Sequence, residues 1–159
     1  MNFVGITITI NESDIIEAFA RYNLRYLDRL IIFDNGSSDN TLLILNKLVD
    51  EGLPITIREL NKQNLQPRKK LDQVLRELSK LSNVTHAFPL DSDELLLVPS
   101  REALEQDLQN IPPGHSALAP WVTYCPTEKD DWTEPDPVRR ITHRRKQEIE
   151  QYYKVIVSR

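Results

Sequence analysis

The sequence predicts an α/β fold with a mostly parallel sheet, on two observations. Short apolar runs rich in β-branched residues alternate along the chain with longer stretches that keep helical spacing. Polar clusters follow several of the apolar runs directly. Strands that alternate with helices are typical of βαβ units, which pair in parallel and cross over right-handed. With 159 residues, 40% of them apolar and 28% charged, the chain fits one globular domain.

Six strands are expected. The first, over residues 3–10, alternates apolar residues with Thr7 and Thr9, and the others carry similar apolar runs. The remaining five are predicted over residues 29–33, 54–60, 86–90, 116–124 and 154–158.

Four helices are expected between these strands. Ser13 is a plausible N-cap for a helix that runs to Leu24, and Gly52 is placed to end a helix over residues 41–49. Gln66-Pro67 opens a third helix, and Ser100 caps a fourth that ends at Leu108. The third carries one apolar face, made of Leu71, Val74, Leu75 and Leu78.

Composition disfavours several classes of protein. The net charge of −4 argues against a nucleic-acid-binding role, and no apolar run approaches the ~20 residues that span a bilayer. Cys125 is the single cysteine, so it forms no internal disulfide and a reducing compartment is expected. The first residues have no basic region typical of a signal peptide. We expect a cytoplasmic protein, with peripheral attachment to the inner membrane face left open.

Three polar clusters follow predicted strands: Asn11-Glu12, residues 34–39 and residues 91–94. The carboxyl ends of parallel strands lie at one edge of a sheet, and ligands of open α/β sheets bind outside that edge. The three clusters are therefore expected to converge in space.

Asp91-Ser92-Asp93-Glu94 is the most informative run. Like charges this close raise each other's pKa unless a positive charge lies between them. A divalent cation is one remedy, because hard ions take carboxylate oxygens and bridge them to phosphates. The run therefore predicts a metal–phosphate site. A solvated acidic loop at a strand end is the alternative.

Three motifs, taken together, resemble those of the family 2 glycosyltransferases of GT-A fold. They are Asn-Glu after the first strand, Asp34-Asn-Gly-Ser-Ser-Asp-Asn-Thr41 after the second and Asp-x-Asp after the fourth. The resemblance covers about the first hundred residues. It implies a three-layer, Rossmann-like α/β/α sandwich of the nucleotide-diphospho-sugar transferases. It also implies transfer of a sugar from a UDP-, GDP- or dTDP-linked donor to an unknown sugar or lipid acceptor, as in polysaccharide biosynthesis.

The resemblance implies a role for each motif. The stretch from Ile8 through Asn11 to Glu12 would line the nucleotide base and ribose, with Asp34 and Asn35 near the base. Asp91 would approach the ribose or the metal-bound phosphate. Asp93 would ligate Mn²⁺ or Mg²⁺ on the diphosphate, with Asp91 as the second candidate ligand.

Several residues have simpler interpretations. Asp39 is a good helix cap, and Gly36 suits a turn with positive φ. Trp121 is expected to pack in the core. We expect Arg68 and Lys69, at a helix start, to be solvated. The basic run Arg139–Lys146 is expected to form a solvated helix face. Either group could instead contact an anion.

The chain departs from the family pattern near its end. A downstream Asp or Glu usually serves as general base, but the acidic residues Asp130, Asp131, Glu134 and Asp136 match no base motif. We therefore expect a single GT-A-like domain with its C-terminal part missing: residues 1–98 as the nucleotide-sugar-binding half and 99–159 as the start of the acceptor half.

Two alternatives come from other classes. The first is a non-catalytic nucleotide-sugar-binding or assembly module with a vestigial site. The second is a nucleotidyltransferase, which is disfavoured because Asn11-Glu-Ser13 has neither the glycine nor the lysine that grips a triphosphate. A response-regulator-like fold is disfavoured because no acidic pair follows the first strand.

Overall fold

The computed structural model describes residues 1–60, 74, 76 and 80–159, and the predicted helix from Gln66 falls almost wholly outside these residues. The described strands form one six-stranded sheet of order β3-β2-β1-β4-β6-β5. They are β1 (Phe3–Thr9), β2 (Arg29–Asp34), β3 (Ile55–Glu59), β4 (His86–Pro89), β5 (Ser116–Pro120) and β6 (Tyr153–Ser158). The described helices are α1 (Ile16–Asn23), α2 (Thr41–Asp50), α4 (Arg101–Leu108) and α5 (Pro137–Arg140).

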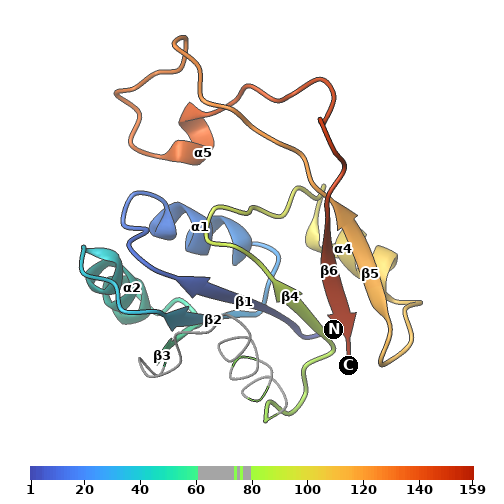
Figure 1. The fold of residues 1–159 in the computed structure, drawn as a ribbon. Helices are drawn as coiled ribbons and strands as arrows, with labels where there is room; N and C mark the ends of the chain where they lie inside the picture. Colours follow the sequence, from blue (N-terminus) through green and yellow to red (C-terminus); the bar gives the residue numbers. More distant parts are fainter. Residues whose placement is uncertain (61–73, 75, 77–79) are drawn as a thin grey trace.

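The first four strands are parallel and nearly in phase. Thr9 pairs with Asp34, and Asp34 with Glu59, so β1, β2 and β3 end side by side. β4 pairs with β1 on the other side, whereas β6 runs antiparallel to both β4 and β5. The carboxyl ends of β1, β2 and β4 therefore share one edge of the sheet, as the sequence predicts (Figure 1).

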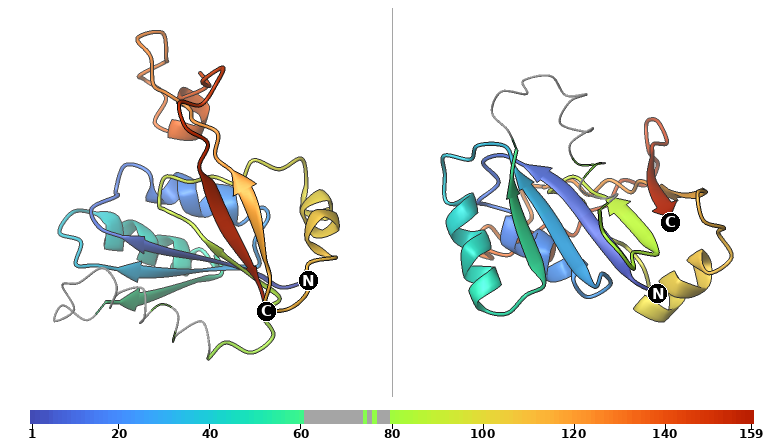
Figure 2. Two further views of the ribbon diagram at one scale, coloured as in Figure 1. Left: turned by 45° about the vertical axis from the view of Figure 1, so that its right-hand side comes forward. Right: turned by 90° about the horizontal axis from the view of Figure 1, so that it is seen from below.

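Alternation along the strands gives the sheet two apolar faces. Phe3, Leu30 and Phe88 pack with α1, α2 and α4 on one face, where α1 and α2 lie side by side (Figures 1 and 2). Val4 and Phe33 belong to a second cluster on the other face. Because neighbouring strand residues point to opposite faces, burial of both requires a layer on each side. The predicted layered α/β fold is confirmed.

Gly5 in the middle of β1 allows this close packing. A Cβ atom placed there would lie 2.5 Å from Leu30 Cδ2 and 2.6 Å from Leu27 Cδ1. Any side chain at this position would require the Leu30 and Leu27 side chains to shift.

Among the strands and the helices α1, α2 and α4, two boundaries differ from the sequence predictions by more than one residue. Ser13 is not the N-cap of α1, which begins at Ile16; its backbone N–H instead donates to Asp39 Oδ2 over 3.1 Å. β5 ends at Pro120 rather than at residue 124. Beyond it the next bridge joins Tyr124 to Arg144. Between the end of β5 and this bridge the two segments differ in length, since residues 145–151 on one side face only residues 122 and 123 on the other. Residue-by-residue pairing therefore stops at this point.

Residues 121–152 leave the sheet between β5 and β6 and project away from it, with α5 in the projecting part (Figures 1 and 2). Of the described residues, none lies in a helix long and apolar enough to cross a membrane.

Candidate functional site

The loops after β1 and β2 are joined by direct hydrogen bonds. Asn11, which adopts a left-handed φ of 55°, accepts from Ser38 N at its Oδ1 over 2.8 Å. The backbone N–H of Glu12 donates to Thr41 Oγ1 over 2.8 Å. Asp39 accepts from Thr41 N, the first N–H of α2, at 2.9 Å, but the N-cap position is held by Asn40, so the predicted cap is wrong by one residue.

The loop after β4 meets the loop after β1 through Glu12. The half-buried Glu12 carboxyl interacts with the side chain of Ser92, which is buried. Burial raises the pKa of Glu12, the Ser92 contact opposes that shift, and the neighbouring charges of Asp14, Asp93 and Asp39 raise the pKa further. The three polar clusters therefore converge as expected, and Ser92 contributes to their junction.

Asp34 is buried and organises the turn after β2. Its carboxylate accepts from Gly36 N at 2.9 Å and from Ser37 N at 3.1 Å. Gly36 has a φ of 91°, which confirms the predicted positive-φ turn. Asn35 is half-buried and its N–H donates to Thr9 O over 2.9 Å.

A small cavity of about 100 Å³ lies beside this turn. Its described lining residues are Asp34, Gly36, Ser37, Leu42, Glu59 and Leu60. Ile8 lies in register with Phe33 at the same edge and is 37% exposed, so its side chain is open to a ligand.

The loop after β4 is a tight acidic turn. Glu94 Oε2 accepts from Asp91 N over 2.8 Å, and Glu94 N donates to Asp91 O over 3.0 Å. These bonds leave the Asp91 and Asp93 side chains exposed on either side of buried Ser92.

Lys154 of β6 also contacts this turn, although the sequence did not indicate that it is part of the site. Its Nζ lies 2.8 Å from Asp91 Oδ2 and 3.0 Å from Glu94 Oε2. The only signal in the sequence is a lysine within an otherwise apolar run. Asn23 of α1, fully buried, is a second residue of the site that the sequence did not indicate.

Solved structures share this architecture, whereas the other two comparisons found no match. No protein-family model matches the chain, and no curated protein matches it. Among solved structures, a mannosyltransferase from Pyrobaculum calidifontis in complex with GDP-Man and Mn²⁺ matches with a TM-score of 0.54. It is 20% identical over 72% of this chain and 34% of its own. The chain has the GT-A fold.

Two further structures match less closely. One is TarS 1–349 of S. aureus in complex with UDP, with a TM-score of 0.47 and 21% identity over 69% of this chain and 31% of its own. The other is the M. tuberculosis glucosyl-3-phosphoglycerate synthase in complex with UDP, with a TM-score of 0.43. It is 22% identical over 69% of this chain and 39% of its own. The chain thus spans about a third of the length of these proteins.

The acidic turn of this GT-A fold has a donor set that fits a hard cation. Magnesium is commonly held by one or two carboxylates together with substrate phosphates, and Asp91 and Asp93 offer two exposed carboxylates. No group of three or more His, Cys, Asp or Glu among the described residues could hold a metal ion by itself. Water molecules and phosphate oxygens from a ligand would therefore complete the coordination.

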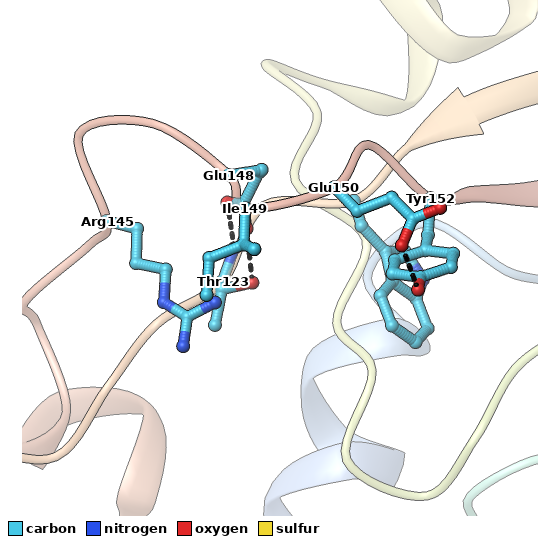
Figure 3. A pocket seen from close by; sticks show the side chains of 7 residues that line it. Thr123, Arg145, Glu148, Ile149, Glu150 and Tyr152 are labelled. Carbon is cyan, nitrogen blue, oxygen red and sulfur yellow. Dashed lines mark hydrogen bonds between the residues drawn. The ribbon is translucent and has the colours of Figure 1, made fainter.

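A second cleft, of about 300 Å³, lies where the projecting segment leaves the sheet (Figure 3). Within it Glu148 accepts from Thr123 N and Oγ1, and Tyr152 donates to Glu150, which fixes these side chains. The described lining residues are Trp121, Thr123, Arg145, Glu148, Ile149, Glu150 and Tyr152.

Two predictions about this segment are wrong. Trp121 does not pack in the core but is 40% exposed, because the regular β5–β6 ladder ends before it; it stacks at a tilt against Tyr152, with ring centroids 5.7 Å apart. The basic run Arg139–Lys146 is not one helix face, since α5 ends at Arg140. Arg145 instead lines the cleft.

The four acidic residues considered as a general base are all engaged locally. Asp130 is buried and pairs with His143 Nδ1 at 2.9 Å, and Asp131 accepts from Thr133. Glu134 accepts from Asp136 N, and Asp136 caps α5 through Val138 N. Each of these carboxylates therefore stabilises a turn of the projecting segment.

Proposed function

We propose that this chain is the nucleotide-sugar-binding part of a metal-dependent glycosyltransferase. The observation that carries the proposal is the junction of the loops after β1, β2 and β4 at one edge of a GT-A sheet, with Asp91 and Asp93 at its surface. The occurrence of GDP-Man with Mn²⁺ in the mannosyltransferase of the same fold supports it.

In this proposal each loop binds one part of a UDP-, GDP- or dTDP-linked sugar. Asp34 and Asn35, beside the small cavity, face the base, and Ile8 offers apolar surface to the base and ribose. Asn11 and Glu12 hold the first two loops together around the ribose.

Asp93 and Asp91 would hold Mn²⁺ or Mg²⁺ against the diphosphate. When bound, the cation supplies positive charge that stabilises the negative charge developing on the leaving diphosphate. The protein's own contribution is a rigid turn, since the two hydrogen bonds between Asp91 and Glu94 and the buried Ser92 fix its backbone before ligand arrives.

A second candidate function is nucleotide-sugar binding without transfer. The engagement of Asp130, Asp131, Glu134 and Asp136 in local turns favours it. Hydrogen bonds within these turns lower the pKa of Asp130 and Asp131, which makes both carboxylates weaker bases toward an acceptor hydroxyl.

A thermal-shift panel tests the donor site. UDP, GDP, CDP and dTDP are each added with and without Mn²⁺ to the wild type, to Asp93→Asn and to Asp107→Asn, an exposed aspartate on α4 as matched control. Binding at a hundredfold excess over Kd stabilises by about 2.7 kcal/mol, or roughly 5–10 °C for a domain of this size.

We expect one nucleotide to raise the Tm only with Mn²⁺, in the wild type and in Asp107→Asn but not in Asp93→Asn. The absence of any nucleotide-dependent shift would contradict the proposal. If the shift occurs but release of the nucleotide from its sugar is never detected with candidate acceptors, the second function is the one supported.

A further inference from the structure

Lys154 closes the acidic turn from the far end of the chain. β6 brings it beside β4, where Nζ bonds Asp91 at 2.8 Å and Glu94 at 3.0 Å. Its Nζ also lies 5.8 Å from the centroid of the Trp121 ring, at the wall of the second cleft. One side chain therefore contacts the acidic turn and faces the aromatic wall.

The ammonium group is held in place as well as charged. Its side chain is 26% exposed, and this burial lowers the pKa of Lys154, but the hydrogen bonds to Asp91 and Glu94 outweigh that effect and raise the pKa overall. No other lysine or arginine among the described residues forms an ion pair with Asp91 or Glu94. Lys154 thus supplies the positive charge that a run of three carboxylates requires.

We propose that Lys154 is a positioning residue that competes with a divalent cation for Asp91 and so makes cation binding depend on the donor diphosphate. This inference rests on the proposed function. The ammonium at 2.8 Å from Asp91 Oδ2 takes one acceptor position of that oxygen, and its positive charge repels a cation that approaches the same carboxylate.

The diphosphate resolves this competition. When Asp91 turns to a metal, the ammonium keeps its bond to Glu94 and loses one carboxylate partner. The negative charge of a bound diphosphate then replaces that partner. Metal and nucleotide should therefore strengthen each other's binding, and by linkage the strengthening is reciprocal.

The first experiment measures Mn²⁺ alone, with no nucleotide present. The spin-resonance signal of free Mn²⁺ gives the affinity of the wild type, of Lys154→Met and of Lys47→Met. Lys47 is the matched control, since it pairs with Glu51 on the surface of α2. We expect Lys154→Met to bind Mn²⁺ on the order of tenfold more tightly, because the carboxylates lose a competing charge a few ångströms away. Lys47→Met should match the wild type.

The second experiment repeats the titration with UDP, GDP, CDP and dTDP. In the wild type the effective nucleotide should tighten Mn²⁺ binding severalfold, and in Lys154→Met this enhancement should shrink. If no nucleotide changes Mn²⁺ binding in the wild type, the proposed function fails. The Mn²⁺ affinities of the wild type and Lys154→Met without nucleotide still decide whether Lys154 competes with the cation for Asp91.

Equal Mn²⁺ affinity of the wild type and Lys154→Met, including no binding by either, would overturn the inference. Circular dichroism checks the fold of each variant. If Lys154→Met does not fold, Lys154→Gln takes its place, because its amide can still donate to Asp91 or Glu94 but carries no charge.

Discussion

The carboxamide of Asn23, the last residue of α1, ties together the backbone of the turn that follows β4. Its Nδ2 donates to Glu94 O over 2.9 Å, and its Oδ1 accepts from Leu96 N over 2.9 Å. Asn23 is completely buried, and both hydrogen bonds are partly shielded from water. A helix on one face of the sheet thereby sets the position of the acidic turn at its edge.

Asn23→Ala is expected to lower the free energy of unfolding by about 2–4 kcal/mol, because it removes the partners of two partly buried backbone groups and leaves a gap in the core. Urea unfolding measures this. Asn46→Ala is the control, since Asn46 makes a comparable bond to Leu42 O on the exposed side of α2 and should cost well under half as much. Equal losses for the two variants would mean that Asn23 does not clamp the turn.

Gly36→Ala is expected to cost about 1–2 kcal/mol, because its φ of 91° is a left-handed conformation that alanine adopts poorly. Gly52→Ala should cost a similar amount, since Gly52 has a φ of 89° with nothing within 4 Å of a new Cβ. Only Gly36→Ala should weaken nucleotide binding, because Gly36 N anchors the Asp34 carboxylate. Calorimetric titration separates the two, and an equal nucleotide affinity in both variants would speak against a role for this turn.

Glu12→Gln should change the pH dependence of stability. The pKa of Glu12 is raised in the folded protein, chiefly by burial, so the folded state binds more protons than the unfolded state. Wild-type stability therefore falls as pH rises from the unfolded pKa near 4.5 through the folded value. Glutamine has no charge to bury, so the variant should be more stable than the wild type at pH 7 and equal to it at pH 4.

Urea midpoints at the two pH values check this prediction. A variant that is less stable than the wild type at pH 7 would mean that the Glu12 carboxylate gains more from its neighbours than it loses by burial. Glu17→Gln, on the exposed side of α1, is the control for a general charge effect.

Much of the fold followed from local patterns in the chain. Alternating apolar residues predicted β1, the apolar run before Asp34 predicted β2, and Ser100 was correctly predicted as the cap of α4, where it accepts from Ala103 N. Such signals are readable because they rest on neighbours a few residues apart. The convergence of the polar clusters also followed, since parallel pairing leaves the strand ends no other arrangement.

Contacts between distant segments could not be predicted in this way. Lys154 lies far along the chain from Asp91, and its position depends on the antiparallel pairing of β6 with β4. Trp121 was misassigned to the core because its exposure depends on where the β5–β6 ladder stops.

The sequence by itself therefore determined the order of strands and helices and the acidic run at the sheet edge. The tertiary structure decided how that run is held and neutralised, through Asn23 from α1, Ser92 in the turn itself and Lys154 from β6. The physical reason is that hydrophobic periodicity is a local property of the chain. The charge balance of a site depends instead on side chains that only the assembled sheet brings within hydrogen-bonding distance.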